Sequence, residues 1–389
     1  MEMELKPLDS TDRSTTPKDE RSLLKSDSTT SSSSASSASY TAINSENLLE
    51  LEKKCAAYVR KDVYGPMGRG VLPLQEKILL GLSMVTLVPI RLVSGILVLI
   101  VYFLICRLCT LFSGRGGENE GEEDLVHMTG WRRETVVQAG RFCARSMLFV
   151  FGFYWIRVED RSFQNETMQQ SDEVERPGAI VSNHVSYVDI LYHMSSSFPS
   201  FVAKASVAKL PLVGLISKCL GCIYVQRESK ASDSKGVSGA VTERVQEAHQ
   251  NKNCPMMLLF PEGTTTNGEY LLPFKSGAFL AKAPVIPVIL RYPYKRFSPA
   301  WDSMAGMRHL FLLLCQFVNH MEVIKLPVYY PSEEEKEDPR LYANNIRKLM
   351  ATEGKLVLSE IGLSEKRVYH AALNGNSNSP PRHLQKKED

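Results

Sequence analysis

The chain carries little net charge, because 46 lysines and arginines nearly balance 43 aspartates and glutamates and leave a formal charge of +3. Proteins that bind nucleic-acid phosphates concentrate basic residues on one face, often between aromatic side chains. This sequence has neither pattern. We therefore expect no nucleic-acid partner.

Two common site signatures are also missing. Cys219 and Cys222 form a CxxC pair, but no second pair and no paired histidines accompany it, as a zinc site would require. A redox pair stays open here, with small buried thiols facing a reducing cytosol as the alternative. No Gly-x-Ser-x-Gly elbow occurs, which argues against a serine hydrolase.

The two ends of the chain are polar. The N-terminal 50 residues lack the apolar core of a signal peptide, and Ser28–Ser39 is a Ser/Thr/Ala tract typical of disorder. The last four residues, Lys386-Lys387-Glu388-Asp389, resemble a dilysine retrieval signal of endoplasmic-reticulum membrane proteins, which coat proteins recognise. A charged, solvated tail is the alternative.

A long apolar run predicts a membrane segment. Between Ile78 and Cys106 the only charged residue is Arg91, which follows Pro89. One helix over this run would rise roughly 43 Å and could cross a bilayer, whereas two arms, 78–90 and 92–106, would each be too short. Residues 51–77 hold six lysines and arginines against two in 107–127, which places the N-terminal flank in the cytosol. We expect a hairpin that enters the membrane and returns, with both termini cytosolic.

A second apolar stretch, Ser146–Ile156, favours an interfacial helix, with packing against the globular domain as the alternative. The sequence then alternates between short apolar runs and helical stretches, which predicts an α/β domain with a largely parallel or mixed sheet flanked by helices. Expected strands are 178–183, 200–203, 221–226, 256–260, 285–290 and 321–329; expected helices are 186–196, 207–219, 237–250 and 339–362.

These patterns divide the chain into seven parts. They are a disordered tail (1–50), a basic cytosolic flank (51–77), a membrane helix or hairpin (78–112), an acidic linker (113–127), the α/β domain (128–330), a C-terminal helical segment (331–370) and a flexible tail (371–389).

His184 is the only one of eight histidines with an aspartate five residues later, Asp189. Residues five apart cannot face each other on one helix. We therefore expect His184 on the loop that leaves a strand, with Asp189 reaching back from the first turn of the next helix. A neutral imidazole held by a carboxylate is a general base near neutral pH.

Three further motifs follow this one. Gly221–Arg227 is a strand that ends in a guanidinium, Phe260–Gly268 is a strand that breaks into a turn at Pro261 and Gly263, and Val285–Leu290 is an apolar strand interrupted by Pro287. The four motifs, in this order and spacing, resemble the glycerophospholipid acyltransferase superfamily, whose first motif is H-x4-D and whose third is EGT. The whole pattern is most similar to the plant lysophosphatidylethanolamine acyltransferases.

The resemblance implies acyl transfer from acyl-CoA, as a co-substrate, to a lysophospholipid hydroxyl at an endoplasmic-reticulum membrane, with no bound cofactor. His184 would be the general base and Asp189 would fix its tautomer. Arg227 would hold the substrate phosphate, Glu262 and Gly263 would shape the acceptor pocket, and Pro287 would shape the acyl-CoA side or mark an edge strand. The remaining candidates for substrate binding are Asn183, Lys204 and Thr264.

One departure from the family pattern bears on the substrate. Thr265 stands where phosphatidate-forming relatives usually carry arginine after Glu-Gly-Thr. A lysophosphatidate monoester carries nearly two negative charges and a headgroup diester carries one. Loss of a cation therefore favours a substrate with a headgroup, unless Lys204 or Lys275 compensates.

Several alternatives stay open. Asp189, His193 and His184 are close enough in sequence to suggest a metal site, although no fourth ligand is in sight. A non-enzymatic lipid-binding membrane protein is the alternative from another class. Within the enzymes, the alternatives are a lysophosphatidylcholine or lysophosphatidate acyltransferase and a CoA-independent transacylase.

Overall fold

A computed structural model describes residues 48–111, 128–161, 175–225 and 231–374, with backbone only for 231–235. A seven-stranded sheet runs through the catalytic part of the chain, in the order β1-β8-β7-β2-β5-β3-β4. Neighbouring strands are parallel except β7 and β8, so the sheet is mixed, as the sequence predicts. The strands are β1 (Ile156–Asp160), β2 (Ala179–Ser182), β3 (Ser200–Lys204), β4 (Ile223–Val225), β5 (Met257–Leu259), β7 (Val285–Arg291) and β8 (Met321–Lys325).

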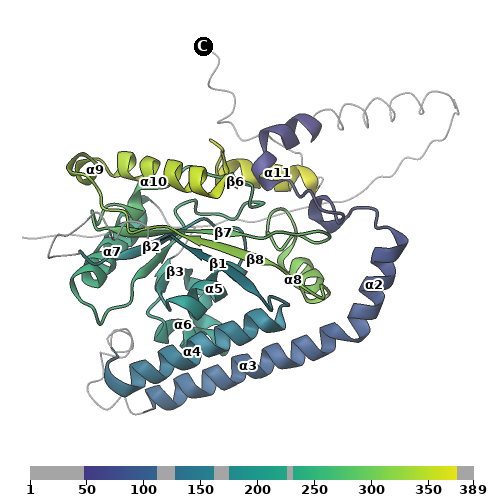
Figure 1. Cartoon of the computed structure of the whole chain (residues 1–389), viewed down its shortest axis with the longest axis horizontal. Helices are drawn as coiled ribbons and strands as arrows, with labels where there is room; N and C mark the ends of the chain where they lie inside the picture. The colour runs from purple at the N-terminus through teal and green to yellow at the C-terminus, as the bar shows by residue number, and fades with distance from the viewer. Residues whose placement is uncertain (1–47, 112–127, 162–174, 226–230, 375–389) are drawn as a thin grey trace, which may run out of the picture. The chain divides into compact units, whose positions relative to one another are not determined.

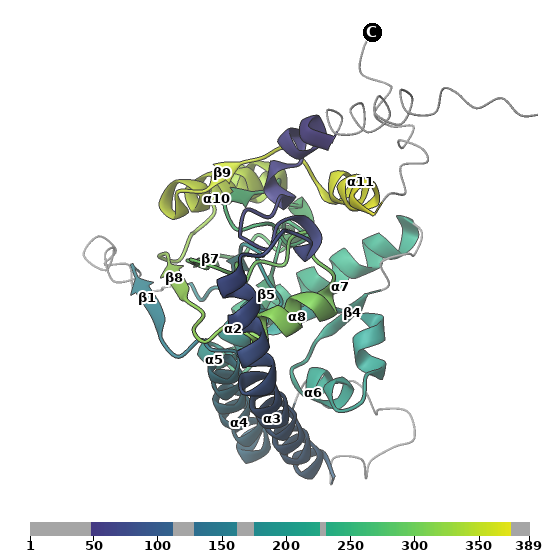
Figure 2. The ribbon, with the colours of Figure 1, turned by 90° about the vertical axis from the view of Figure 1, so that its right-hand side faces the viewer.

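Helices cover both faces of this sheet (Figures 1 and 2). In β2 and β5 every residue is buried, because alternate side chains enter the two separate cores. One core packs β2, β5 and β7 against α7 and α10, and the other packs them against α4, α5 and α8. The helices are α2 (Leu74–Val85), α3 (Leu87–Thr110), α4 (Gly130–Val150), α5 (Val188–Ser196), α6 (Val213–Cys219), α7 (Ala231–Gln250), α8 (Gly306–Leu314), α9 (Glu333–Glu337), α10 (Pro339–Gly354) and α11 (Leu363–Leu373).

Short elements complete the chain. Residues 48–54 are α-helical. Four 3-10 turns follow among the described residues: η1 (Ala56–Tyr58), η2 (Pro66–Gly68), η4 (Ala205–Lys209) and η5 (Ser276–Ala278). A two-stranded parallel sheet pairs β6 (Tyr270–Leu271) with β9 (Val357–Leu358).

Of α4, the sequence predicted only the end, within the helix expected over 146–156. The helix over 48–54, the turns η1, η2 and η5, and the strands β1, β6 and β9 were not expected from the sequence. These elements are short or, like β1, largely exposed, so they lack the apolar periodicity that identifies an element in a sequence.

Three expected helices differ from those observed. The helix expected over 207–219 is divided into η4 and α6, because Pro211 and the positive φ of Leu212 (62°) interrupt it. The helix expected over 146–156 is correct only as far as Val150, where α4 ends, and β1 begins at Ile156; Leu148 is buried in the domain core, as the packing alternative expected. The helix expected over 339–362 ends at Gly354, where Lys355 adopts a left-handed conformation with φ 52°.

Pro287 lies inside the sheet. It is buried in β7, opposite Val181 of β2, and its carbonyl accepts a hydrogen bond from the backbone N–H of Leu326 (3.0 Å). Because β7 has partners on both sides, the alternative that Pro287 marks an edge strand is wrong.

The apolar run is divided between two helices that meet at Thr86, before the Pro89–Arg91 break that the sequence suggested. Pro89 lies in the first turn of α3, where a missing N–H is tolerated. The helix α3 does not fold back on α2 but runs beside α4 (Figures 1 and 2). The two are antiparallel, since Tyr102 donates to the carbonyl of Val136 while Arg91 reaches Tyr154. The hairpin expected within 78–106, with arms 78–90 and 92–106, is therefore wrong: α3 is continuous from Leu87 to Thr110, and it forms a helical hairpin with α4 instead.

By length and composition α3 could cross a membrane: its most apolar window has a mean hydropathy of 2.5, and only 17% of that window is buried. The buried residues Arg91, Tyr102, Cys106 and Cys109 are spread along its whole length. Ile90, Val93 and Leu108 are 64–66% exposed. One side of α3 thus contacts protein from end to end, while the other is exposed and apolar as far as Arg107 near the end of the helix.

Arg91 fastens α3 to the α/β domain. Its side chain donates to the carbonyls of Leu314 (2.8 Å), Gln316 (2.5 Å) and Phe317 (3.1 Å) and to the hydroxyl of Tyr154 (2.9 Å). These carbonyls follow α8, where the last turn of a helix leaves acceptors unsatisfied. A charge inside an apolar run is thereby explained by the helix end that it caps.

We expect Arg91→Leu to lower the free energy of unfolding by about 2–4 kcal/mol, because three buried carbonyls lose their donor. Thermal unfolding in detergent micelles measures this. Arg107→Leu is the matched control, since Arg107 is exposed on the same helix. Equal melting temperatures for the two variants would contradict the assignment.

Candidate active site

His184 stands on the loop after β2, and Asp189 lies in the first turn of α5. Nδ1 of His184 is 2.9 Å from Oδ2 of Asp189. The Asp189 side chain is fully buried, whereas the His184 side chain is 21% exposed. The loop therefore places a solvent-accessible imidazole on a buried carboxylate, in the arrangement expected from the sequence.

The carboxylate of Asp189 is held from several directions. Oδ2 also accepts the backbone N–H groups of Val185 (2.7 Å) and Ser186 (2.9 Å), and Oδ1 accepts the hydroxyl of Tyr292 (2.5 Å). With both oxygens occupied by donors, Asp189 is suited to orient His184. If Nδ1 of the imidazole carries the proton towards Asp189, Nε2 is left unprotonated and can act as a base.

A second buried carboxyl group holds the backbone of His184. Oε1 of Glu262 accepts the N–H of His184 (2.8 Å), and Oε2 accepts that of Leu272 (2.9 Å). Burial raises the pKa of Glu262 from 4.5 to about 8, while the two N–H groups and the charge of Arg347 oppose this shift. Glu262 thus joins the third motif to the first through the main chain.

The ring of His184 is also fixed by stacking. The ring of Phe260 lies parallel to it, with centroids 4.1 Å apart and planes 19° apart. Phe260 covers one face of the His184 ring, and Asp189 occupies Nδ1. Nε2 is therefore the ring nitrogen that is left to accept a proton. None of the described residues donates to or accepts from Nε2.

The metal-site alternative is not supported by the geometry. His193 is 2% exposed, its Nε2 has no hydrogen-bond partner among the described residues, and burial lowers its pKa to about 4, so it is neutral at pH 7. Across the described residues, no group of three His, Cys, Asp or Glu side chains is placed to hold an ion. The oxygens of Asp189 are taken up by donors.

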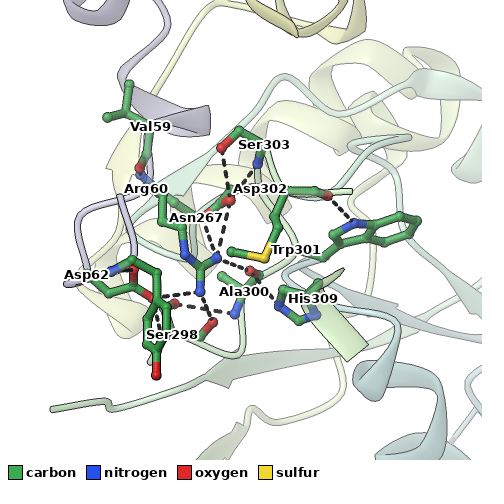
Figure 3. A network of polar contacts seen from close by, with 12 residues as sticks. Val59, Arg60, Asp62, Asn267, Ser298, Ala300, Trp301, Asp302, Ser303 and His309 are labelled. Atoms are coloured by element: carbon green, nitrogen blue, oxygen red, sulfur yellow. Dashed lines mark hydrogen bonds and ion pairs between the residues drawn. The ribbon is translucent and has the colours of Figure 1, made fainter. Parts of the chain in front are cut away.

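The loop after β7 is hydrogen-bonded to the loop that carries His184. The backbone N–H of Trp301 donates to the carbonyl of Val185 (2.8 Å), and the hydroxyl of Thr265 donates to the carbonyl of Trp301 (2.5 Å). Figure 3 shows the buried guanidinium of Arg60 directed at Asp302 and the carbonyl of Ala300. A segment that precedes α2 and α3 therefore braces the loop that contacts the first motif.

Asn183, Gly263 and Thr264 were expected to bind substrate. The amide of Asn183 pairs with both backbone groups of Leu290 (2.8 and 2.9 Å), which ties the end of β2 to β7 and gives this residue a positioning role. Gly263 has φ +70°, and the ammonium of Lys275 occupies the space where a Cβ would lie. Thr264 is buried beside it.

The other expected residues lie further apart or outside the described part of the chain. Lys204 is exposed at the end of β3, and Pro287 is buried within β7. Arg227 lies outside the described residues. Lys275, which the sequence suggested only as a compensating charge, is exposed and lies over the Glu-Gly-Thr turn.

Sequence reasoning missed Tyr292 and Trp301, and it could have found the first. Tyr292 directly follows β7, and β7 pairs in parallel with β2, so both strands end at the same edge of the sheet. A polar residue just past a predicted strand was the available signal. Trp301 acts through its backbone, for which a sequence carries no signal.

We expect Tyr292→Phe to lower kcat for acyl transfer by about 10- to 100-fold, because a hydrogen bond to a charged acceptor contributes about 1.5–3 kcal/mol. Steady-state kinetics measures this, at a temperature where thermal unfolding shows that both proteins are folded. Tyr294→Phe is a suitable control, since Tyr294 is 37% exposed. An unchanged kcat would show that Asp189 does not need this partner.

Comparisons with known proteins agree with this geometry. The family model "Acyltransferase" matches residues 156–291. The lysophospholipid acyltransferase LPEAT1 of Arabidopsis thaliana is 57% identical and is covered over 100% of both chains. The lysophosphatidylcholine acyltransferase of Drosophila melanogaster is 36% identical over 69% of this chain and 47% of its own, and human lysophosphatidylcholine acyltransferase 1 is 34% identical over 71% and 48%.

The chain thus spans about half the length of these two animal relatives. Among solved structures, the 1-acyl-sn-glycerophosphate (LPA) acyltransferase PlsC of Thermotoga maritima matches 68% of this chain and 98% of its own, with 19% identity and a TM-score of 0.39. On the identity with the Arabidopsis enzyme over the full length of both chains, this protein belongs to the lysophospholipid acyltransferase family.

Proposed function

We propose that the protein transfers an acyl group from acyl-CoA to a lysophospholipid, with His184 as general base and Asp189 as its orienting carboxylate. The observation that carries the proposal is the partly exposed His184 ring, held by Asp189 at 2.9 Å and by Phe260, with Nε2 open. No enzyme nucleophile is needed, since the lipid hydroxyl itself attacks.

The reaction proceeds in two steps. Nε2 of His184 takes the proton of the lysophospholipid hydroxyl as its oxygen attacks the thioester carbonyl. The tetrahedral intermediate collapses, the carbon–sulfur bond breaks, and the CoA thiolate takes the proton from the imidazolium. Asp189 stabilises the imidazolium between the two steps, and its four hydrogen bonds keep the ring in place.

The headgroup proposal, ethanolamine, rests on the family resemblance and on charge. The hydroxyl of Thr265 is turned into the protein, where it contacts Trp301 and Lys366, so it offers nothing to a phosphate. Lys275 puts one exposed ammonium over Gly263. Thr265 thus supplies no cation where phosphatidate-forming relatives carry arginine, and the loss of that cation suits a phosphodiester with one negative charge better than a monoester with nearly two.

Membrane association is supported by the exposed apolar side of α3 and by Phe142 and Phe149 of α4, which are 74% and 56% exposed. Because α3 contacts protein along its whole length, we infer that this hairpin enters one leaflet without crossing it. Both termini would then be cytosolic, at the endoplasmic-reticulum membrane. Coat proteins would be partners through Lys386 and Lys387, which lie outside the described residues.

The first test is purified protein with labelled acyl-CoA and a panel of lysophosphatidylethanolamine, lysophosphatidylcholine and lysophosphatidate, ranked by kcat/KM. We expect lysophosphatidylethanolamine to rank first and His184→Ala to lower kcat by about 10²–10⁴-fold. His320→Ala is the control, because His320 is exposed. If His184→Ala changed neither turnover nor lipid binding, the protein would be a non-enzymatic lipid-binding protein. If another lysolipid ranked first, only the proposed ethanolamine headgroup would be wrong, and the proposed acyl transfer would stand.

The second test concerns location. We expect protease added to intact microsomes to remove tags from both termini, because neither end crosses the bilayer. We also expect Lys386→Ser with Lys387→Ser to move the protein beyond the endoplasmic reticulum in fluorescence images. A tag at either terminus that resists the protease would contradict the single-leaflet topology. A double variant that stays in the endoplasmic reticulum would exclude the dilysine signal.

A further inference from the structure

Lys366 is a buried lysine with no role in the proposed chemistry. It lies on α11, far beyond the matched acyltransferase domain, and is 7% exposed. Its ammonium donates to the carbonyl oxygen (2.7 Å) and to the hydroxyl (2.9 Å) of Thr265. Thr265 directly follows Glu-Gly-Thr, so a helix near the C-terminus contacts the third motif of the active site.

The groups that face this ammonium come from every element packed against it. The Tyr58 ring of η1 lies 5.2 Å away, and its hydroxyl donates to the carbonyl of Gly362 (2.7 Å). The charges of Asp302 and Glu262 attract Lys366, although Asp302 is already paired with Arg60. On α11 itself, His370 contacts the carbonyl of Asp302. Burial outweighs these attractions and lowers the pKa of Lys366 to about 8.

Docking of α11 does not need this charge. An apolar cluster of Cys55, Ala57, Tyr58, Leu272 and Tyr369 already holds the helix. A buried ammonium is costly unless it is bonded, and an apolar side chain of similar size is often as stable or more so. The packing of α11 therefore does not explain why a charged residue stands at position 366.

Hydrogen bonds lead from Lys366 to the catalytic loop by two routes. The hydroxyl of Thr265, which accepts from Lys366, donates to the carbonyl of Trp301, whose N–H donates to the carbonyl of Val185. The next residue, Thr266, donates its N–H to the carbonyl of His184 (3.0 Å). Fixing Thr265 at two atoms thus fixes the main chain on both sides of the His184 carbonyl.

We propose that Lys366, in its charged form, is a positioning residue that holds the Glu262–Thr266 turn against the His184 loop, so that α11 is part of the active site. Its ammonium does not touch substrate. Neutral lysine can still donate hydrogen bonds, but bonds from a charged donor are roughly twice as strong. Loss of the proton should therefore loosen the loop and lower kcat, with little effect on the KM for the lysolipid.

Stability should respond to pH in the opposite sense. Because the pKa of Lys366 is lower in the folded protein (about 8) than its ordinary value of 10.5, the unfolded chain binds more protons between these values. The contribution of Lys366 to the free energy of unfolding thus rises as pH increases through this window. A purely structural lysine would not make kcat fall while stability rises.

The inference rests on the proposed acyl transfer, and the experiment measures kcat, KM and thermal unfolding of the full-length protein from pH 7 to 9.5. For the wild type we expect kcat to fall about tenfold across this range. Lys366→Arg, which keeps its charge, should lose this alkaline decline. Lys366→Met should show the lower kcat at every pH and remain folded. Arg367→Met, an exposed neighbour on the same helix, should follow the wild type.

A wild-type kcat that is constant to pH 9.5, or a Lys366→Met variant as active as wild type, would overturn the inference. So would an alkaline decline that persists in Lys366→Arg. If Lys366→Met fails to fold, the comparison of wild type with Lys366→Arg still decides the question. A wild type inactive with every lysolipid would instead refute the proposed function.

Discussion

The carboxylate of Asp189 is the group on which the site depends. It is fully buried, and it accepts hydrogen bonds from the His184 ring, two loop N–H groups and Tyr292. A buried charge persists only where donors replace the lost water. The hydrogen bonds that make this burial possible are the same ones that hold the loop and orient the His184 ring, so the stability of the loop and the orientation of the imidazole have one cause.

The order of the strands explains why the motifs meet. β2 lies between β5 and β7 and is parallel to both, so the loops that follow the three strands leave the same edge of the sheet. His184 follows β2, Glu262 follows β5 and Tyr292 follows β7. Residues more than a hundred positions apart thus contact each other through side chains and main chain, which no local pattern could achieve.

The parts outside the matched domain contribute to the site as well. Arg60, ahead of α2 and α3, supports the loop that contacts Val185, and Lys366, near the C-terminus, contacts Thr265. Arg91 attaches α3 to the end of α8. The edge of the sheet that carries His184 is therefore contacted by segments from both sides of the matched domain, and α3 is bonded to the same domain.

The sequence by itself determined the family, the mixed α/β domain, the long apolar segment and the contact of His184 with Asp189. These depend on local signals: apolar periodicity, breaks at glycine and proline, and a spacing of five residues across a strand-to-helix turn. The sequence placed the break in the apolar run at Pro89, whereas the two helices meet at Thr86. It also left open that Pro287 marks an edge strand, because the neighbours of a strand in a sheet are distant in sequence. Only the tertiary structure decided that α4 packs against α3, that Asn183 binds the main chain of β7, and that Tyr292 and Lys366 join the site, since each of these contacts is made between segments that the chain brings together only on folding.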